Sequence, residues 1–233
     1  MNILYEDNSI IVINKPAGIA SQSANIAQQD CVSQIKNHLK QNNEVKGEPY
    51  VGVIHRLDQP VSGILVFAKN KQAAANLSKQ IQEDIMNKKY YALVEGKVTD
   101  SEEKILLKNQ IYKDTKASKA VVVNSKGKAE QKIKVQEASL FYKVKKYYEK
   151  EDVTLLDIEL ITGRFHQIRC QLSNMGNPIV NDKKYGAKRA FLSDFSGEEM
   201  IAAKGIGLRA YELEFKHPEN GKTMIFSLDL QND

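Results

Sequence analysis

Short apolar runs separated by polar turns recur along the chain, a pattern typical of a sheet protein with few helices. Apolar residues at 3–5 and 10–13, with a polar turn between them, predict an N-terminal hairpin. The long runs 138–148 and 153–161, joined by a charged turn, predict a second hairpin. The remaining strands are expected at 51–54, 64–67, 90–94, 206–215 and 223–230. Because most strands follow one another directly, the sheet should be antiparallel or mixed.

Three segments carry the period of an amphipathic helix. About two turns are indicated by Val32, Ile35 and Leu39. A longer helix can be capped by Asn70, and one of its faces carries Ala74, Leu77, Ile81 and Ile85. A third helix follows Gly163 and ends at Gly176, with three residues facing inward: Ile168, Leu172 and Met175.

These elements predict an α+β fold. We expect a single domain over residues 1–233, built on a mixed, mainly antiparallel sheet with a few flanking helices and a central cleft. No linker or internal repeat interrupts it, and residues 187–205 are the expected insertion or mobile loop.

Composition excludes several classes of protein. No apolar run reaches the roughly 18 residues of a membrane helix, and the N-terminus lacks the features of a signal peptide. Cys31 and Cys170 are far apart and are expected as reduced thiols in a cytoplasmic protein. The four histidines are scattered, so no structural zinc site is expected, and the absence of a glycine-rich phosphate loop leaves no place for a nucleotide cofactor.

The net charge of +5 is unevenly distributed. Residues 113–150 contain eleven lysines and four acidic residues, interleaved with Tyr142, Tyr147 and Tyr148. Lysines and exposed rings suit a polyanion, because the ammonium groups meet phosphates and the rings stack on bases. A solvated lysine-rich face is the alternative reading of the same pattern.

The segment from Ile54 to Gly63 is the first candidate site. If it is extended as far as Asp58, side chains alternate, so Arg56 and Asp58 project to the same side just before a turn at Pro60. This arrangement holds a carboxylate in a fixed position within a cleft, although a surface salt bridge at a strand end has the same pattern.

A second group of charged residues spans Thr162 to Arg169. On a helix, Arg164 shares a face with Ile168, and Arg169 lies along the apolar side, where a buried guanidinium needs an acidic partner. Two arginines, a histidine and a glutamine at a helix start favour contact with a polyanion over ordinary surface cations. Tyr90 and its neighbour Tyr91 alternate on a strand, so one should be buried and the other should face a cleft or solvent.

Taken together, the ordered motifs resemble the RluA-type RNA pseudouridine synthase family. They are His55 to Asp58 with Ser62-Gly63, Lys88 to Ala92, Thr162 to Arg169, Gly176 to Ile179 and Asp182 to Gly186, together with Ile13 to Gly18 and Phe215 to Pro218. The resemblance covers the chain from about residue 3 to about residue 218. It implies that the chain begins directly at the catalytic domain, without the small N-terminal RNA-binding domain that many relatives carry.

Members of that family isomerise uridine in RNA to pseudouridine without a metal or cofactor. By resemblance, Asp58 is the catalytic aspartate, Arg169 is its partner, and Tyr90 is the active-site tyrosine that stacks on the base. Asp58 either attacks covalently or removes a sugar proton to give a glycal-like intermediate. Arg56 fills the space left by the flipped base, and four more residues are candidate substrate contacts: Leu57, Arg164, His166 and Gln167. The expected partner is a ribosomal or transfer RNA stem-loop, bound by a monomer.

The chain departs from the pattern of many relatives at four positions. These are Val61 in place of threonine, Gln171 in place of histidine, Asn181 in place of glycine, and the missing proline after Phe226. None of them is a proposed catalytic residue. Two other functions stay open, a catalytically silent RNA-binding protein of the same fold and a hydrolase acting on nucleosides; the lysine-rich segment favours a polymer over a nucleoside.

Overall fold

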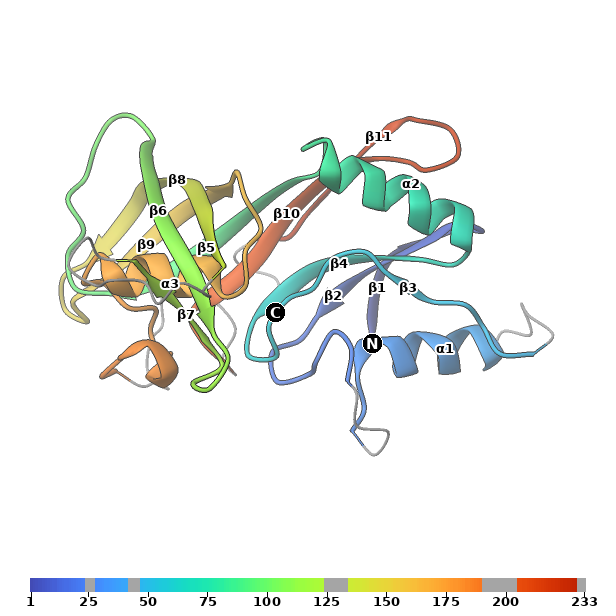
Figure 1. Cartoon of the computed structure of the whole chain (residues 1–233), viewed down its shortest axis with the longest axis horizontal. Coiled ribbons are helices and arrows are strands. Elements are labelled where there is room, and N and C mark those ends of the chain that lie inside the picture. Colours follow the sequence, from blue (N-terminus) through green and yellow to red (C-terminus); the bar gives the residue numbers. More distant parts are fainter. Residues whose placement is uncertain (24–27, 42–46, 124–133, 190–204, 230–233) are drawn as a thin grey trace. The chain divides into compact units, whose positions relative to one another are not determined.

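The computed structural model describes residues 1–23, 28–41, 47–123, 134–189 and 205–229, which belong to two compact units (Figure 1). The first unit comprises residues 1–88 and 209–233, and the second comprises residues 89–208. No helix in the described ranges is long and apolar enough to span a membrane.

The first unit is a mixed sheet with two helices. Its elements are β1 (Asn2–Glu6), β2 (Ile10–Lys15), α1 (Cys31–Gln41), β3 (Gly52–Val53), β4 (Ser62–Ala68), α2 (Lys71–Gln82), β10 (Leu208–Lys216) and β11 (Thr223–Ser227). The strands pair in the order β1-β2-β4-β10-β11, and only the β4–β10 pair is parallel. The short β3 adds to β4 in antiparallel register.

Helix α2 packs against β3 and β4 (Figure 1). Asn70 caps it as predicted, since its side chain accepts a hydrogen bond of 2.8 Å from the Ala73 N–H. Ala73 and Leu77 on its inner face join a core supplied by β2, β4 and β10. This core holds β4, and with it the turn that precedes β4.

The second unit is an antiparallel sheet with a short helix. Its elements are β5 (Asn87–Glu95), β6 (Ile105–Asp114), β7 (Lys119–Val122), β8 (Val135–Tyr148), β9 (Val153–Leu160), α3 (Gln167–Asn174) and the 3₁₀ helix η1 (Lys183–Tyr185). The strands pair in the order β5-β9-β8-β6-β7. Helix α3 packs against β7 and η1, with Cys170 and Tyr185 buried beside Ile111, Ala120 and Ala138.

The α+β class and the mixed, mainly antiparallel sheet are confirmed, and so are both predicted hairpins and the closing strands. The start of the third helix was predicted wrongly. His166 has a left-handed backbone (φ 50°, ψ 29°), so α3 begins only at Gln167, and Arg164 and Phe165 lie before it instead of on its faces. A single domain with a central cleft stays a prediction, and most of the predicted loop 187–205 lies outside the described residues.

Gly63, in the parallel pair of β4 with β10, provides a test of this packing. Its φ is +125°, and a Cβ atom added there would lie 2.2 Å from the carbonyl oxygen of Ala210. We expect Gly63→Ala to lower the free energy of unfolding by about 3 kcal/mol or more, because both strain and a backbone clash oppose it. Gly163→Ala is the matched control, since no atom lies within 4 Å of its added Cβ. Equal denaturant midpoints for the two variants would contradict this packing.

Candidate active site

Asp58 lies in a tight turn that leads into β4. The Asp58 carbonyl accepts a hydrogen bond of 3.0 Å from the Val61 N–H, which closes the turn. Arg56 is exposed, Leu57 is buried and Asp58 is half-buried. The alternation expected from the sequence is therefore present, although residues 55–58 lie outside the strands. The Leu57 side chain is buried, and its role in substrate binding stays a prediction.

The residue after Asp58 is fixed by a buried ammonium group. Lys15 is fully buried, and its Nζ donates to the carbonyls of Pro16 (3.0 Å), Ile19 (2.7 Å) and Gln59 (3.3 Å). The Gly18 N–H also donates to the Gln59 carbonyl (2.8 Å), and the Gln59 side chain returns a bond to the Gly18 carbonyl (3.0 Å). We call this set of bonds the Lys15 clamp.

The residue before Asp58 is fixed by the same loop. The hydroxyl of Ser21 donates to the Leu57 carbonyl (2.8 Å) and accepts from the Leu57 N–H (3.0 Å). The backbone on both sides of Asp58 is thus bound to residues 15–21. Sequence reasoning used the segment Ile13 to Gly18 only as part of a resemblance, and it missed Lys15 and Ser21. The available signal was a lysine that follows the apolar run Ile10 to Ile13 after a single asparagine.

Burial lowers the pKa of Lys15 to about 8, although the nearby Asp58 carboxylate acts in the opposite direction. Lys15 is therefore mostly charged at neutral pH. Its ammonium places a positive charge close to Asp58, in addition to holding the turn.

His55, next to Arg56, has a structural role. Its Nε2 accepts a hydrogen bond of 3.3 Å from the Val66 N–H of β4, so the ring carries its proton on Nδ1. Burial, together with the positive charge of Lys88, holds its pKa well below the usual value, and the ring is neutral at pH 7.

Arg169 is the centre of a buried network in the second unit. Its guanidinium makes two bonds to Asp182, from Nε (2.7 Å) and from Nη2 (2.8 Å). Both side chains are almost fully buried. The expectation that a buried Arg169 needs an acidic partner is therefore met by Asp182, which the sequence reasoning did not single out. A pairing of Arg169 with Asp58 stays a prediction.

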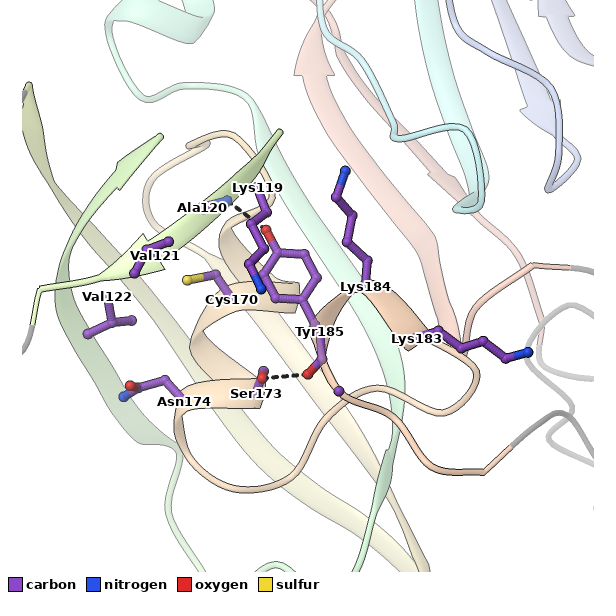
Figure 2. A pocket seen from close by; sticks show the side chains of 11 residues that line it. Lys119, Ala120, Val121, Val122, Cys170, Ser173, Asn174, Lys183, Lys184 and Tyr185 are labelled. Carbon is purple, nitrogen blue, oxygen red and sulfur yellow. Dashed lines mark hydrogen bonds between the residues drawn. The ribbon is translucent and has the colours of Figure 1, made fainter. Parts of the chain in front are cut away.

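His166 and Tyr185 extend this network. His166 Nε2 lies 3.2 Å from Arg169 Nη1, and His166 Nδ1 lies 2.9 Å from the Tyr185 hydroxyl. Because a guanidinium can only donate, Nε2 must accept, so the ring is neutral and its Nδ1–H donates to Tyr185. The Ala120 N–H also donates to that hydroxyl (2.7 Å; Figure 2). Phe165 stacks on the His166 ring, with centroids 3.8 Å apart.

The remaining predicted residues of this unit differ in exposure. Tyr90 is buried on β5 and Tyr91 is half-buried, in agreement with their predicted alternation. Gln167 is buried, and its side chain bonds Thr162 Oγ1, the Arg164 N–H and the Ser139 carbonyl. These bonds brace the start of α3, and a contact of Gln167 with RNA stays a prediction. Arg164 is exposed, with Nε donating to the Glu137 carbonyl.

Part of the lysine-rich segment lies within the described residues. Tyr142 is buried, so its ring is not displayed on the surface beside the lysines, as the sequence pattern had suggested. Tyr147 donates to the Asp152 carboxylate, and Lys146 lies over the Tyr148 ring. In the part of the chain that the structure describes, no group of three or more His, Cys, Asp or Glu could hold a metal ion.

Comparison with known proteins places this site in a family. The RNA pseudouridylate synthase family matches residues 9–174. An uncharacterized RNA pseudouridine synthase of Aquifex aeolicus is 34% identical over 232 residues, which cover 98% of this chain and 69% of the relative. Ribosomal large subunit pseudouridine synthase C of Buchnera aphidicola subsp. Schizaphis graminum is 34% identical over 230 residues, covering 96% and 65%. Ribosomal large subunit pseudouridine synthase D of Neisseria meningitidis serogroup B is 34% identical, and the match covers 100% of this chain and 59% of the relative.

Two solved structures share the fold. They are the human RNA pseudouridylate synthase domain containing proteins 1 and 4, each with a TM-score of 0.72 and with 21% and 22% identity. The matches cover 98% of this chain and 82% and 88% of the human chains. The chain belongs to the RNA pseudouridylate synthase family, and the RluA-type resemblance is confirmed. It spans about two thirds of the length of the bacterial relatives that it matches.

The Lys15 clamp predicts a large loss of stability for Lys15→Met. The variant leaves the carbonyls of Pro16 and Ile19 without their ammonium donor, so we expect the free energy of unfolding to fall by about 3 kcal/mol. Lys71→Met, at an exposed lysine of the same unit, is the control and should change it by about 0.5 kcal/mol or less. Urea unfolding curves measure both. Equal stability of the two variants would show that the clamp contributes nothing.

His55 predicts a dependence of stability on pH. The folded protein keeps the ring neutral, whereas the unfolded chain binds a proton with the usual pKa of 6.5. Stability should therefore fall below about pH 6.5, by up to ~1.4 kcal/mol for each pH unit. His55→Gln, which keeps an acceptor for the Val66 N–H, should show a flatter curve between pH 7 and pH 5. Parallel curves of melting temperature against pH would contradict the assignment.

Proposed function

We propose that this chain isomerises specific uridines in structured RNA to pseudouridine, with Asp58 as the catalytic carboxylate. The observation that carries the proposal is the hydrogen bonding on both sides of Asp58, within a family match that includes this turn. A surface ion pair needs no such support, whereas a reacting carboxylate must be held in one position.

The reaction is a rearrangement within one nucleotide. The bond between N1 of the base and C1′ of the ribose breaks, the base turns, and a bond from C5 to C1′ forms. C5 loses a proton and N1 gains one, so the product is an isomer of the substrate. No oxidant, reductant or group donor is consumed, and the proposal includes no metal, nucleotide cofactor or other cofactor.

Asp58 acts in this scheme as an ionised carboxylate. It either attacks the sugar or base covalently, or removes a sugar proton to give a glycal-like intermediate. Both routes need the carboxylate in a partly dry site, where a nearby positive charge offsets the cost of burial. Lys15 supplies one such charge in the first unit, and Arg169 is the second group that we propose for this role.

The target base must leave its stack before it can react, which costs a few kcal/mol. Arg56 is exposed next to Asp58, and we propose that its guanidinium occupies the vacated space and contacts phosphate. Tyr90 is proposed to stack on the flipped base. Arg164 is the exposed arginine of the segment Thr162 to Arg169, and we propose that it contacts RNA. His166 is proposed to orient Arg169.

Relatives named as ribosomal large subunit pseudouridine synthases make ribosomal RNA the first substrate class to test, with transfer RNA as the second. Action as a monomer and a cytoplasmic location belong to the same proposal.

Asp58→Asn tests the role of the carboxylate. Ribosomal and transfer RNA transcripts carrying tritium at C5 of uridine would be incubated separately with each protein, and release of tritium to water would be measured. We expect release from one RNA class by the wild type. For the variant, the single-turnover rate should be lower by about 10³-fold or more, because an amide is neither a nucleophile nor a base of comparable strength.

The control is Asp100→Asn, at an exposed aspartate of the second unit, which should match the wild type. The affinity of Asp58→Asn for RNA should stay within about threefold of that of the wild type. A carboxylate repels phosphate, so its replacement removes no attractive contact with RNA. Appreciable tritium release by Asp58→Asn under single-turnover conditions would remove Asp58 from the chemistry.

A further inference from the structure

A pocket of about 470 Å³ lies in the second unit between β7, the C-terminal half of α3 and η1 (Figure 2). Its lining divides into a cationic part and an apolar part. The cationic part is formed by Lys119, Lys183 and Lys184. The apolar part includes Ala120, Val122 and Cys170, all buried or half-buried. None of these residues has a role in the proposed chemistry.

The three lysines differ in their pairing from other lysines of the second unit. Among the described residues no carboxylate lies within 4 Å of their ammonium groups, whereas Lys104 and Lys108 of the same unit are paired with glutamates. Asp182, which precedes Lys183, already accepts hydrogen bonds from Nε and Nη2 of Arg169. Lys119 extends over the Tyr185 ring, with its Nζ 5.8 Å from the ring centroid (Figure 2). The pocket therefore has lysines without a carboxylate partner around an apolar surface and an aromatic ring, with the side chains of Lys183 and Lys184 extending away from Lys119 (Figure 2).

This lining selects for a nucleotide of a nucleic acid strand. Successive phosphates of a strand can meet the separate lysines, and a base or sugar covers the apolar side chains, which an inorganic anion would leave exposed to water. The volume falls within the range of pockets that bind small organic groups. We propose that the pocket binds one nucleotide of the RNA substrate, outside the isomerised uridine, with the adjoining phosphates of the strand at the lysines. This inference rests on the proposed function.

The position of Tyr185 favours a nucleotide of the substrate strand over a free nucleotide. Tyr185 lines the pocket, its hydroxyl meets His166, and its ring centroid lies 5.0 Å from Arg169 Cζ. A strand that enters the pocket therefore lies beside the side chains that orient Arg169. Binding there also adds affinity without contributing to the chemical step.

The first test is the double variant Lys183→Gln/Lys184→Gln. Affinity for the RNA that the wild type modifies would be measured over a series of salt concentrations. We expect about 10-fold weaker binding at moderate salt, and a salt dependence (the slope of log K against log salt) reduced by about 1 to 2, because each lost phosphate contact removes nearly one unit. The single-turnover rate at saturating RNA should be unchanged.

Lys104→Gln/Lys108→Gln is the matched control, since it removes the same charge from lysines that are already paired. The affinity of this control for RNA and its salt slope should change by less than half as much as those of the Lys183→Gln/Lys184→Gln variant. If the pocket variant and the control have the same affinity and slope while the wild type is active, the pocket proposal is wrong and the proposed function stands.

Site-directed cross-linking tests the position directly. Cys31 and Cys170 are buried, and burial raises the pKa of each thiol to about 11, so neither should react with a maleimide. A photoactivatable group can therefore be attached selectively at Asn174→Cys, at the rim of the pocket, or at Glu103→Cys, in an exposed turn of the same unit.

We expect the label at position 174 to cross-link the substrate RNA and the label at position 103 to give little product. Tritium release by the unlabelled wild type in the same preparation reports on the proposed function separately. An active wild type with no cross-link from position 174, or with equal yields from both positions, would overturn the pocket assignment.

Discussion

A buried lysine ammonium is the constraint on which the candidate site depends. A charged group out of water is costly unless hydrogen bonds replace its hydration, and Lys15 has three backbone carbonyls that do so. Two of these come from its own loop and the third from Gln59, directly after Asp58. The chain can satisfy Lys15 only when the loop and the turn are together. Folding of the first unit therefore positions the carboxylate before any substrate arrives.

The second unit uses an ion pair for a similar purpose. Arg169 is held by two bonds to Asp182, and its third nitrogen faces a neutral His166. A guanidinium fixed in this way has little conformational freedom to lose when it acts on a substrate. Burial raises the pKa of Tyr185, so the phenol that anchors His166 also stays neutral. The charged groups of the network are therefore Arg169 and Asp182, while His166 and Tyr185 are neutral.

Much of the fold could be predicted from local pattern, since alternation and capping depend on near neighbours. The Asn70 cap and the hairpin of β8 and β9 are examples. The site was harder to predict, because the contacts that position it join residues that are distant in the sequence. The pairing of Lys15 with Gln59 and the burial of Tyr142 follow from packing that no local pattern reveals.

Three deviations have a physical explanation in backbone and core geometry. His166 adopts a left-handed conformation that side chains rarely take, and this delays the start of α3. Asn181, at a position where many relatives carry glycine, has φ 65°, a region that asparagine tolerates better than most residues. Gln171 is fully buried, and its amide nitrogen bonds the Leu107 carbonyl, the Asn109 side chain and the Ala138 carbonyl, so it serves packing within the unit.

The central claim is that this chain makes pseudouridine in RNA through Asp58. The most direct measurement is a map of pseudouridine in the ribosomal and transfer RNA of a strain that lacks the gene, complemented with the wild type or with Asp58→Asn. The account predicts that at least one pseudouridine disappears on deletion, returns with the wild type and stays absent with the variant. An unchanged map after deletion, or full restoration by the variant, would contradict it.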